Sequence, residues 1–209
     1  MLSKTRFDIH LMQEEDRLPA LTLLKSSFFH DEPLARYLEL GEPADFAENV
    51  INDSINDRCS FVAYDTETNQ FAGLCLNEIK FKNVQYLNTE SNEKLYFILH
   101  LLDHLHENVN LFDEFLTDSL LHIFIINVQS QYRGFGLSSR LISSSLEHAK
   151  QFNVGGAYAE ATNIYSFNAF KQQNFQVYHQ LNYAQYDQVR LANLTDKTHD
   201  QCRLVARPI

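Results

Sequence analysis

The sequence has few of the residues that cross-link a chain, and no segment suited to a membrane. Its 3 cysteines, Cys59, Cys75 and Cys202, lie far apart and in no Cys-x-x-Cys spacing. This excludes a disulfide framework, argues against a thiolate zinc site and favours a reducing compartment. No stretch approaches the roughly 20 apolar residues of a membrane span, and the first residues lack the apolar core of a signal peptide. We therefore expect a cytoplasmic protein without a membrane partner.

Positive charge is also scarce. The chain has 17 Lys and Arg against 27 Asp and Glu, a formal net charge of −10 at pH 7. Nonspecific binding to nucleic acid depends on cationic contacts with phosphates, so we expect no nucleic-acid partner. Hydrophobic residues make up 44% and aromatic residues 12%, which excludes a disordered or fibrous chain. At 209 residues, we expect positions 1–209 to form a single domain.

The apolar pattern changes between strand and helix spacing along the chain. Phe7, Ile9 and Leu11 alternate as in a half-buried strand, and helical spacing follows over 16–29. The near-continuous apolar run Leu120–Val128 is typical of a central strand covered on both faces. Other helices are predicted at 32–40, 44–57, 92–108, from 137 to about 155, and at 164–173, and other strands at 60–65, 70–81, 157–161, 175–186 and 201–208. This order predicts a mixed α/β sheet.

Two histidines are spaced as metal ligands could be. His100 and His104 are one helical turn apart, on the side of the 92–108 helix opposite its apolar face. With no HExxH motif and no evident third ligand, surface histidines are the better interpretation, and we expect no metal site.

Gly134 and Gly136, two of only 6 glycines, stand between the predicted central strand and the helix that follows. The first amides of a helix lack partners and lie at the positive end of its dipole, so this turn suits a phosphate group. A Rossmann loop would need a third glycine at Ser139, and a P-loop would need Gly-Lys-Ser/Thr. The remaining pattern, Gln131-x-x-Gly134-x-Gly136 with Arg133 inside it, resembles the Gln/Arg-x-x-Gly-x-Gly/Ala signature of the GNAT acyltransferases.

This resemblance implies the GNAT fold, a central twisted mixed sheet flanked by helices, and acetyl-coenzyme A as co-substrate. The loop would hold the pyrophosphate, and the end of the central strand would align the pantetheine arm. The cofactor-binding residues implied in this region are Ile126, Val128, Gln131, Arg133, Gly134, Phe135, Gly136, Leu137 and Ser138.

The segment from Asn163 to Phe175 resembles a second motif of the same superfamily, Asn-x-x-Ala-x-x-x-Tyr-x-x-x-Gly-Phe, whose short helix packs beside the pantetheine arm. It implies cofactor contacts from Asn163, Ser166 and Phe170. Phe170 stands where the superfamily often has the tyrosine that protonates the departing thiolate. That role is then vacant or filled elsewhere, with Tyr165 or Ser166 as the candidates.

A third segment, Ser26–Gly41, contains Phe-Phe-His-Asp-Glu-Pro-Leu and resembles the arylalkylamine N-acetyltransferases, in particular the dopamine N-acetyltransferase-like branch. The resemblance implies that Glu32 is the catalytic base. An alkylamine has a pKa of about 10, so it arrives protonated and must lose a proton before it can attack a thioester. Glu32 could accept that proton if burial raises its pKa. The alternative interpretation is a carboxylate at the start of a helix, favoured by the dipole.

Two further comparisons with this family concern proton transfer. The branch has two serines flanking a tyrosine in its last motif, and they correspond to Thr162 and Ser166, which both keep a hydroxyl. The alternative is that Thr162 or Asn163 caps the following helix. His122 corresponds to the first histidine of a His-x-His pair in the vertebrate branch, but the second position is Phe124, so that route is expected to be absent.

The predicted function is acetyl transfer from acetyl-CoA to small aromatic amines such as dopamine, tyramine, octopamine or serotonin. The amine would attack directly in a ternary complex, without a metal, and we expect a monomer. One rival keeps the fold but uses polyamines or a longer acyl-CoA donor. The other is a non-catalytic module that binds acyl-CoA.

Overall fold

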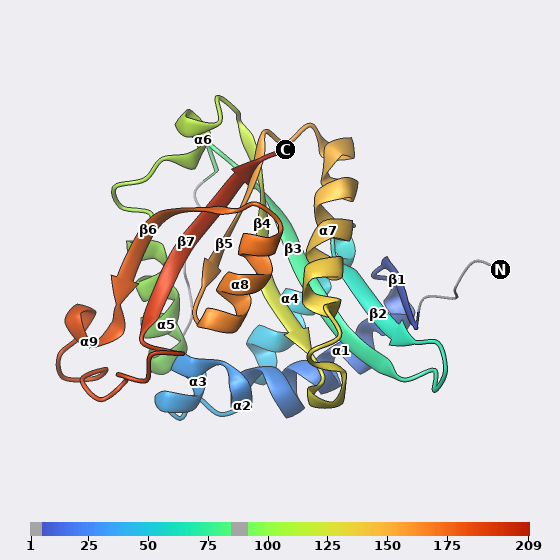
Figure 1. The fold of residues 1–209 in the computed structure, drawn as a ribbon, viewed down its shortest axis with the longest axis horizontal. Coiled ribbons are helices and arrows are strands. Elements are labelled where there is room, and N and C mark those ends of the chain that lie inside the picture. The colour runs from blue at the N-terminus through green and yellow to red at the C-terminus, as the bar shows by residue number, and fades with distance from the viewer. Residues whose placement is uncertain (1–5, 85–91) are drawn as a thin grey trace.

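In the computed structural model, which describes residues 6–84 and 92–209, seven strands form one sheet in the order β1-β2-β3-β4-β5-β7-β6 (Figure 1). Only β4 and β5 run parallel, and the other neighbours are antiparallel. The strands are β1 (Phe7–Leu11), β2 (Phe61–Asp65), β3 (Phe71–Phe81), β4 (Ser119–Val128), β5 (Gly156–Ala161), β6 (Gln176–Asn182) and β7 (Gln201–Pro208). The predicted mixed sheet is confirmed, and β4 lies at its centre.

Helices cover both faces of the sheet. They are α1 (Arg17–Leu23), α2 (Phe29–Asp31), α3 (Pro33–Tyr37), α4 (Ala44–Asn56), α5 (Glu93–His104), α6 (Leu111–Glu114), α7 (Leu137–Ala149), α8 (Ile164–Gln172) and α9 (Tyr183–Tyr186). One apolar core joins α1 to α5 with Leu74 and Leu120 of the sheet, and the other joins α7 and α8 with Leu121. Adjacent strand residues such as Leu120 and Leu121 enter opposite cores because side chains alternate along a strand. We call these the α1–α5 face and the α7–α8 face.

Two predicted elements differ from the structure. The helix predicted over 16–29 contains a π-helical turn, Leu24–Phe28, between α1 and α2. The strand predicted over 175–186 ends at Asn182, whose side chain accepts a hydrogen bond from the Gln185 amide at 3.2 Å and so starts α9. The Tyr183 side chain is fully buried there, so its apolar contribution comes from a helix rather than a strand.

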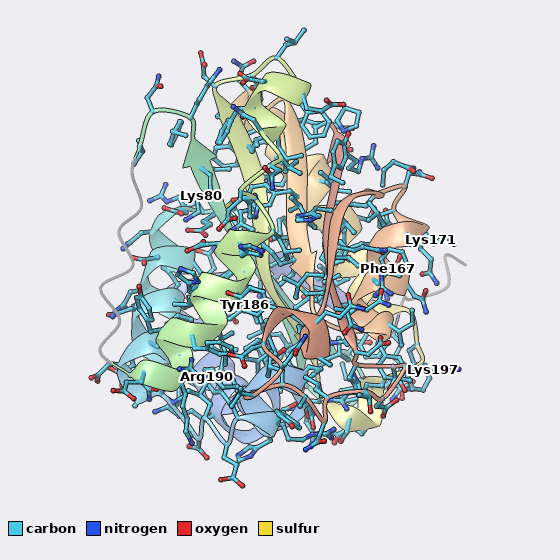
Figure 2. All side chains as sticks on the ribbon, turned by 90° about the vertical axis from the view of Figure 1, so that its left-hand side faces the viewer. Lys80, Phe167, Lys171, Tyr186, Arg190 and Lys197 are labelled. Atoms are coloured by element: carbon cyan, nitrogen blue, oxygen red, sulfur yellow. The ribbon has the colours of Figure 1, made fainter. Side chains whose placement is uncertain are left out.

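The two spaced histidines of α5 lie on its outer side. His100 is exposed and His104 half-buried. The hydroxyl of Tyr186 in α9, labelled in Figure 2, lies 3.4 Å from His100 Nδ1, and the Tyr186 ring lies 5.1 Å from that of His104. Within residues 6–84 and 92–209, no group of three or more His, Cys, Asp or Glu is arranged to hold a metal ion. No helix in those ranges is long and apolar enough to cross a membrane.

The strands β4 and β5 separate partway along their length, and the cavity described below lies at this separation. The two strands pair only over Leu120–His122 and Gly156–Tyr158, although β4 continues to Val128 and β5 to Ala161. On its other side β4 pairs with β3, and Phe124 is skipped there between the Leu76–Ile125 and Asn77–Ile123 pairs. Such a bulge bends a strand and increases its twist. A wedge therefore opens between β4 and β5 at the centre of the sheet.

Candidate active site

A cavity of about 890 Å³ occupies this wedge and is lined by residues from both faces of the sheet. That size is typical of small-molecule and cofactor sites. It is lined by 13 of the residues predicted for the site: Glu32, Ile126, Val128, Arg133, Gly134, Gly136, Leu137, Ser138, Thr162, Asn163, Tyr165, Ser166 and Phe170. Two others lie outside it: Gln131 donates to Gln70, and the half-exposed Phe135 ring packs against Phe7.

The edge of β4 that faces the wedge carries backbone hydrogen-bonding groups. The Gln129 amide donates to the Ala72 carbonyl at 2.9 Å, so Gln129 and Asn127 direct their backbone groups toward β3. Ile126 and Val128 must direct theirs the other way, toward the space that β5 has left. The Val128 carbonyl accepts a hydrogen bond from Arg133 at 3.0 Å. Ile126 and Val128 thus form an open strand edge along which an extended amide ligand can align.

The loop after β4 has a geometry that suits an anion at the start of α7. Gly134 has φ of 84° and Gly136 has φ of 71°, a left-handed conformation that is easy for glycine and strained for other residues. Gly136 is the N-cap of α7, so the first amides of that helix face the cavity without a side-chain cap. Arg133 pairs with the carboxylate of Asp31, the residue before Glu32. The anion loop and the Glu32 segment are therefore in direct contact.

Glu32 lies at the junction of α2 and α3, on the α1–α5 side of the wedge. Its Oε2 accepts a hydrogen bond from the Ala35 amide at 2.6 Å, so Glu32 is the N-cap of α3, as the alternative interpretation predicted. Its Oε1 is buried without a well-aligned hydrogen bond from any described residue. Burial raises the pKa of Glu32 above its usual value, although the Ala35 and Leu34 amides and the Thr162 side chain oppose this. Capping and a raised affinity for protons coexist in one carboxyl group.

The hydroxyl groups near the wedge have different surroundings. The Thr162 side chain reaches the Glu32 carboxylate, and its carbonyl accepts a hydrogen bond from the buried Tyr183 hydroxyl at 2.9 Å. Ser166 Oγ donates to the Asn163 carbonyl at 3.1 Å, within the first turn of α8. Tyr165 is 68% exposed, at the rim of the cavity. Of these three hydroxyls, the structure brings only that of Thr162 to Glu32.

Two motif residues after β5 support this edge of the cavity. Asn163 caps α8, accepting hydrogen bonds from the Tyr165 and Ser166 amides at 2.9 Å each. Phe170 is buried against Phe175, with ring centroids 5.1 Å apart. The capping role that the sequence left open between Thr162 and Asn163 belongs to Asn163.

A buried chain of charges crosses the sheet beside the wedge, on its α1–α5 face. His122 lies between two carboxylates, with Nδ1 2.8 Å from Glu78 and Nε2 2.7 Å from Glu160, and its ring stacks on Tyr158 at 4.4 Å. His106 approaches the other oxygen of Glu160 at 2.6 Å. Lys80, labelled in Figure 2, pairs with Glu78 at 2.8 Å.

The charges in this buried chain of charges determine the protonation states of its side chains. Burial alone would lower the pKa of His122, but the charges of Glu160 and Glu78 outweigh it and raise the pKa to about 9. Burial would likewise raise the pKa of Glu78, but His122 lowers it to about 2, and the pKa of Glu160 falls for the same reason. His122 is thus an imidazolium with both nitrogens occupied. Sequence patterns did not predict this chain, because they do not show which strands are neighbours.

Comparison with known proteins places the fold. No family model matches the chain. Arylalkylamine N-acetyltransferase 2 from Aedes aegypti is similar at 24% identity and a TM-score of 0.88, covering 98% of this chain and 100% of its own. Putative arylalkylamine N-acetyltransferase 7 from the same mosquito gives 17% identity and 0.85, covering 97% and 87%. Drosophila melanogaster polyamine N-acetyltransferase gives 16% identity and 0.75, covering 97% and 100%.

The chain has the GNAT fold. The fold predicted from the glycine loop and the segment around Glu32 is therefore confirmed. The GNAT helix α7, with its open N-terminus, and the separation of β4 from β5 are the two features that shape the cavity.

The charge chain predicts a pH dependence of stability. A histidine whose pKa is raised from 6.5 to about 9 on folding stabilises the folded state fully below pH 6.5 and loses this contribution as pH rises toward 9. The melting temperature of the wild type should fall between pH 6.5 and 9 more steeply than that of His122→Gln. His100→Gln, on the exposed side of α5, is the control and should follow the wild type. Parallel melting curves for wild type and His122→Gln would contradict the assignment of His122 as an imidazolium.

Proposed function

We propose that this chain is an acetyl-CoA-dependent N-acetyltransferase whose acceptors are small arylalkylamines. The observation that carries the proposal is the buried carboxyl of Glu32, with a raised pKa, in the same cavity as an anion-binding helix start. One end of the cavity suits a pyrophosphate, and the other suits removal of a proton from an amine.

The cofactor would bind along β4. Gly134, Gly136 and the first amides of α7 suit the pyrophosphate, and the free edge at Ile126 and Val128 suits the amide groups of the pantetheine arm. The donor thus reaches through the wedge from the α7–α8 face toward Glu32. The comparisons support this assignment, because two similar structures from Arabidopsis thaliana, Naa50 and NAA60, are complexes with bisubstrate analogues, and the analogue bound to Naa50 contains coenzyme A.

The chemistry follows from the position of Glu32. An alkylammonium with a pKa of about 10 transfers a proton to the Glu32 carboxylate, and the neutral amine attacks the thioester carbonyl. The carbon–nitrogen bond forms, the carbon–sulfur bond breaks, and coenzyme A leaves as a thiolate, which takes up the proton that the acylated nitrogen loses. Thr162 is the hydroxyl placed to pass protons to or from Glu32. A raised pKa suits Glu32 to this task because it makes the carboxylate a stronger base.

A row of aromatic side chains lines the acceptor side of the cavity. Phe28, Phe29, Phe46 and Phe124 all line it, and successive ring centroids are 5.4, 6.3 and 6.1 Å apart. Aromatic pairs prefer edge-to-face and offset arrangements at such distances, so an aryl ring can continue the row. This lining favours an acceptor with an aromatic ring and a short amine arm.

One observation favours a polyamine acceptor as a second candidate. A second cavity, of about 710 Å³, shares five lining residues with the first, Phe124 and Glu160 among them. Its lining also includes Glu78 and, at its exposed rim, Asp53 and Asp103. Burial and the nearby Glu160 raise the pKa of Asp103, and a second ammonium group on an acceptor would relieve that repulsion.

The proposed base is tested by Glu32→Gln. Thiol release from acetyl-CoA with dopamine, tyramine and serotonin should fall by a factor of about 10² to 10⁴, because general base catalysis is lost. In the wild type, kcat/KM should rise with pH through the raised pKa of Glu32. Glu42→Gln is the matched control, since Glu42 is an exposed glutamate of the same segment. Full activity of Glu32→Gln would contradict the role. Binding of coenzyme A without turnover of any amine would favour a non-catalytic module.

The second candidate is tested by Asp103→Asn. If polyamines are the acceptors, kcat/KM for spermidine should fall by up to about fivefold, the factor expected for one exposed ion pair, while that for tyramine is unchanged. Asp118→Asn, an exposed aspartate outside the second cavity, is the control. Equal rates with spermidine for all three proteins would exclude Asp103 as a polyamine contact.

A further inference from the structure

One polar side chain in the wedge has a hydrogen-bonding group that the protein does not use. Asn127 of β4 is only 7% exposed and lines the cavity of about 890 Å³. Its Oδ1 lies 3.4 Å from the Ser27 hydroxyl, whereas its Nδ2 is buried and has no hydrogen-bond partner within residues 6–84 and 92–209. Sequence patterns gave no sign of it, because Asn127 falls inside the apolar run that ends β4.

An unused amide at this depth is costly. A buried donor without a partner destabilises a fold, and nearly all buried polar groups in proteins have partners. Leucine has the same branching at Cγ and would place no unpaired polar group there. An asparagine here therefore suits a ligand that supplies the missing acceptor.

The Asn127 side chain is held in place from one side. Ser27 Oγ also lies 3.1 Å from Asp31 Oδ2, and Asp31 pairs with Arg133 of the anion loop. Ser27 therefore lies at the Oδ1 end of the carboxamide, and the Nδ2 end is left for the cavity. It also places Asn127 between the loop that carries Arg133 and the segment that carries Glu32.

We infer that Asn127 is a coenzyme-binding residue, whose Nδ2 donates a hydrogen bond to a carbonyl oxygen of the pantetheine arm. Its neighbours Ile126 and Val128 form the open edge of β4, so a donor molecule that runs from the anion loop to Glu32 passes Asn127. The pantetheine arm carries amide carbonyls in that stretch. The inference rests on the proposed function, since it assumes that acyl-coenzyme A occupies the wedge.

The test is Asn127→Leu, with calorimetric binding of coenzyme A and of adenosine 3′,5′-bisphosphate, which lacks the pantetheine arm. Coenzyme A should bind about 3- to 10-fold more weakly, the factor for one hydrogen bond, while the nucleotide binds as to the wild type. The melting temperature without ligand should be unchanged or higher, because an unpaired polar group has been removed. A purely structural asparagine would give the opposite shift.

Controls separate the possible failures. Asn56→Leu, at the exposed end of α4, should change none of these quantities. If the leucine variant does not fold, Asn127→Ala provides the same comparison of the two ligands. Unchanged coenzyme A affinity, or equal weakening of both ligands, would overturn the inference while leaving the proposed function intact. A wild type that binds neither ligand would overturn both.

Discussion

The site depends on the early separation of two parallel strands. β4 and β5 share three residue pairs and then part, next to the bulge at Phe124. A central strand with an uncovered edge is unusual, because unpaired backbone groups are normally satisfied within the sheet. Here the uncovered edge lies between a helix start without a side-chain cap and a buried carboxyl group. The proposed cofactor would pair with this edge of β4 in place of β5.

Three glutamates near the wedge have pKa values shifted in opposite directions. Glu78 and Glu160 flank a buried imidazolium, so their pKa values fall and they stay ionised. Glu32 is equally enclosed but has amides and a hydroxyl rather than a cation beside it, so its pKa rises. A group that is not neutralised by its neighbours is the one able to exchange a proton. The direction of the pKa shift thus distinguishes the chain of charges, which joins three strands, from Glu32, the proposed catalytic base.

Local patterns predicted much of the fold and part of the site. The run Leu120–Val128 predicted the central strand because a strand buried on both faces has an apolar sequence. The glycines at 134 and 136 predicted the loop, and both adopt the positive φ angles that glycine permits. The ion chain of His122 was not predictable, because its partners come from β3, β5 and the segment after α5. Asn127 was not predicted for a related reason. Its unpaired Nδ2 becomes evident only when the three-dimensional structure places Ser27 next to its Oδ1.

The most direct test is a crystal structure with a conjugate in which the nitrogen of tyramine is joined to coenzyme A. We expect the pyrophosphate to lie on the loop at Gly134 and Gly136 and the pantetheine arm to pass between β4 and β5. The tyramine nitrogen should lie within one bridging water molecule of the Glu32 carboxylate. The aryl ring should then meet the row of phenylalanines. A conjugate bound outside the wedge, or one whose nitrogen is remote from Glu32, would contradict the account.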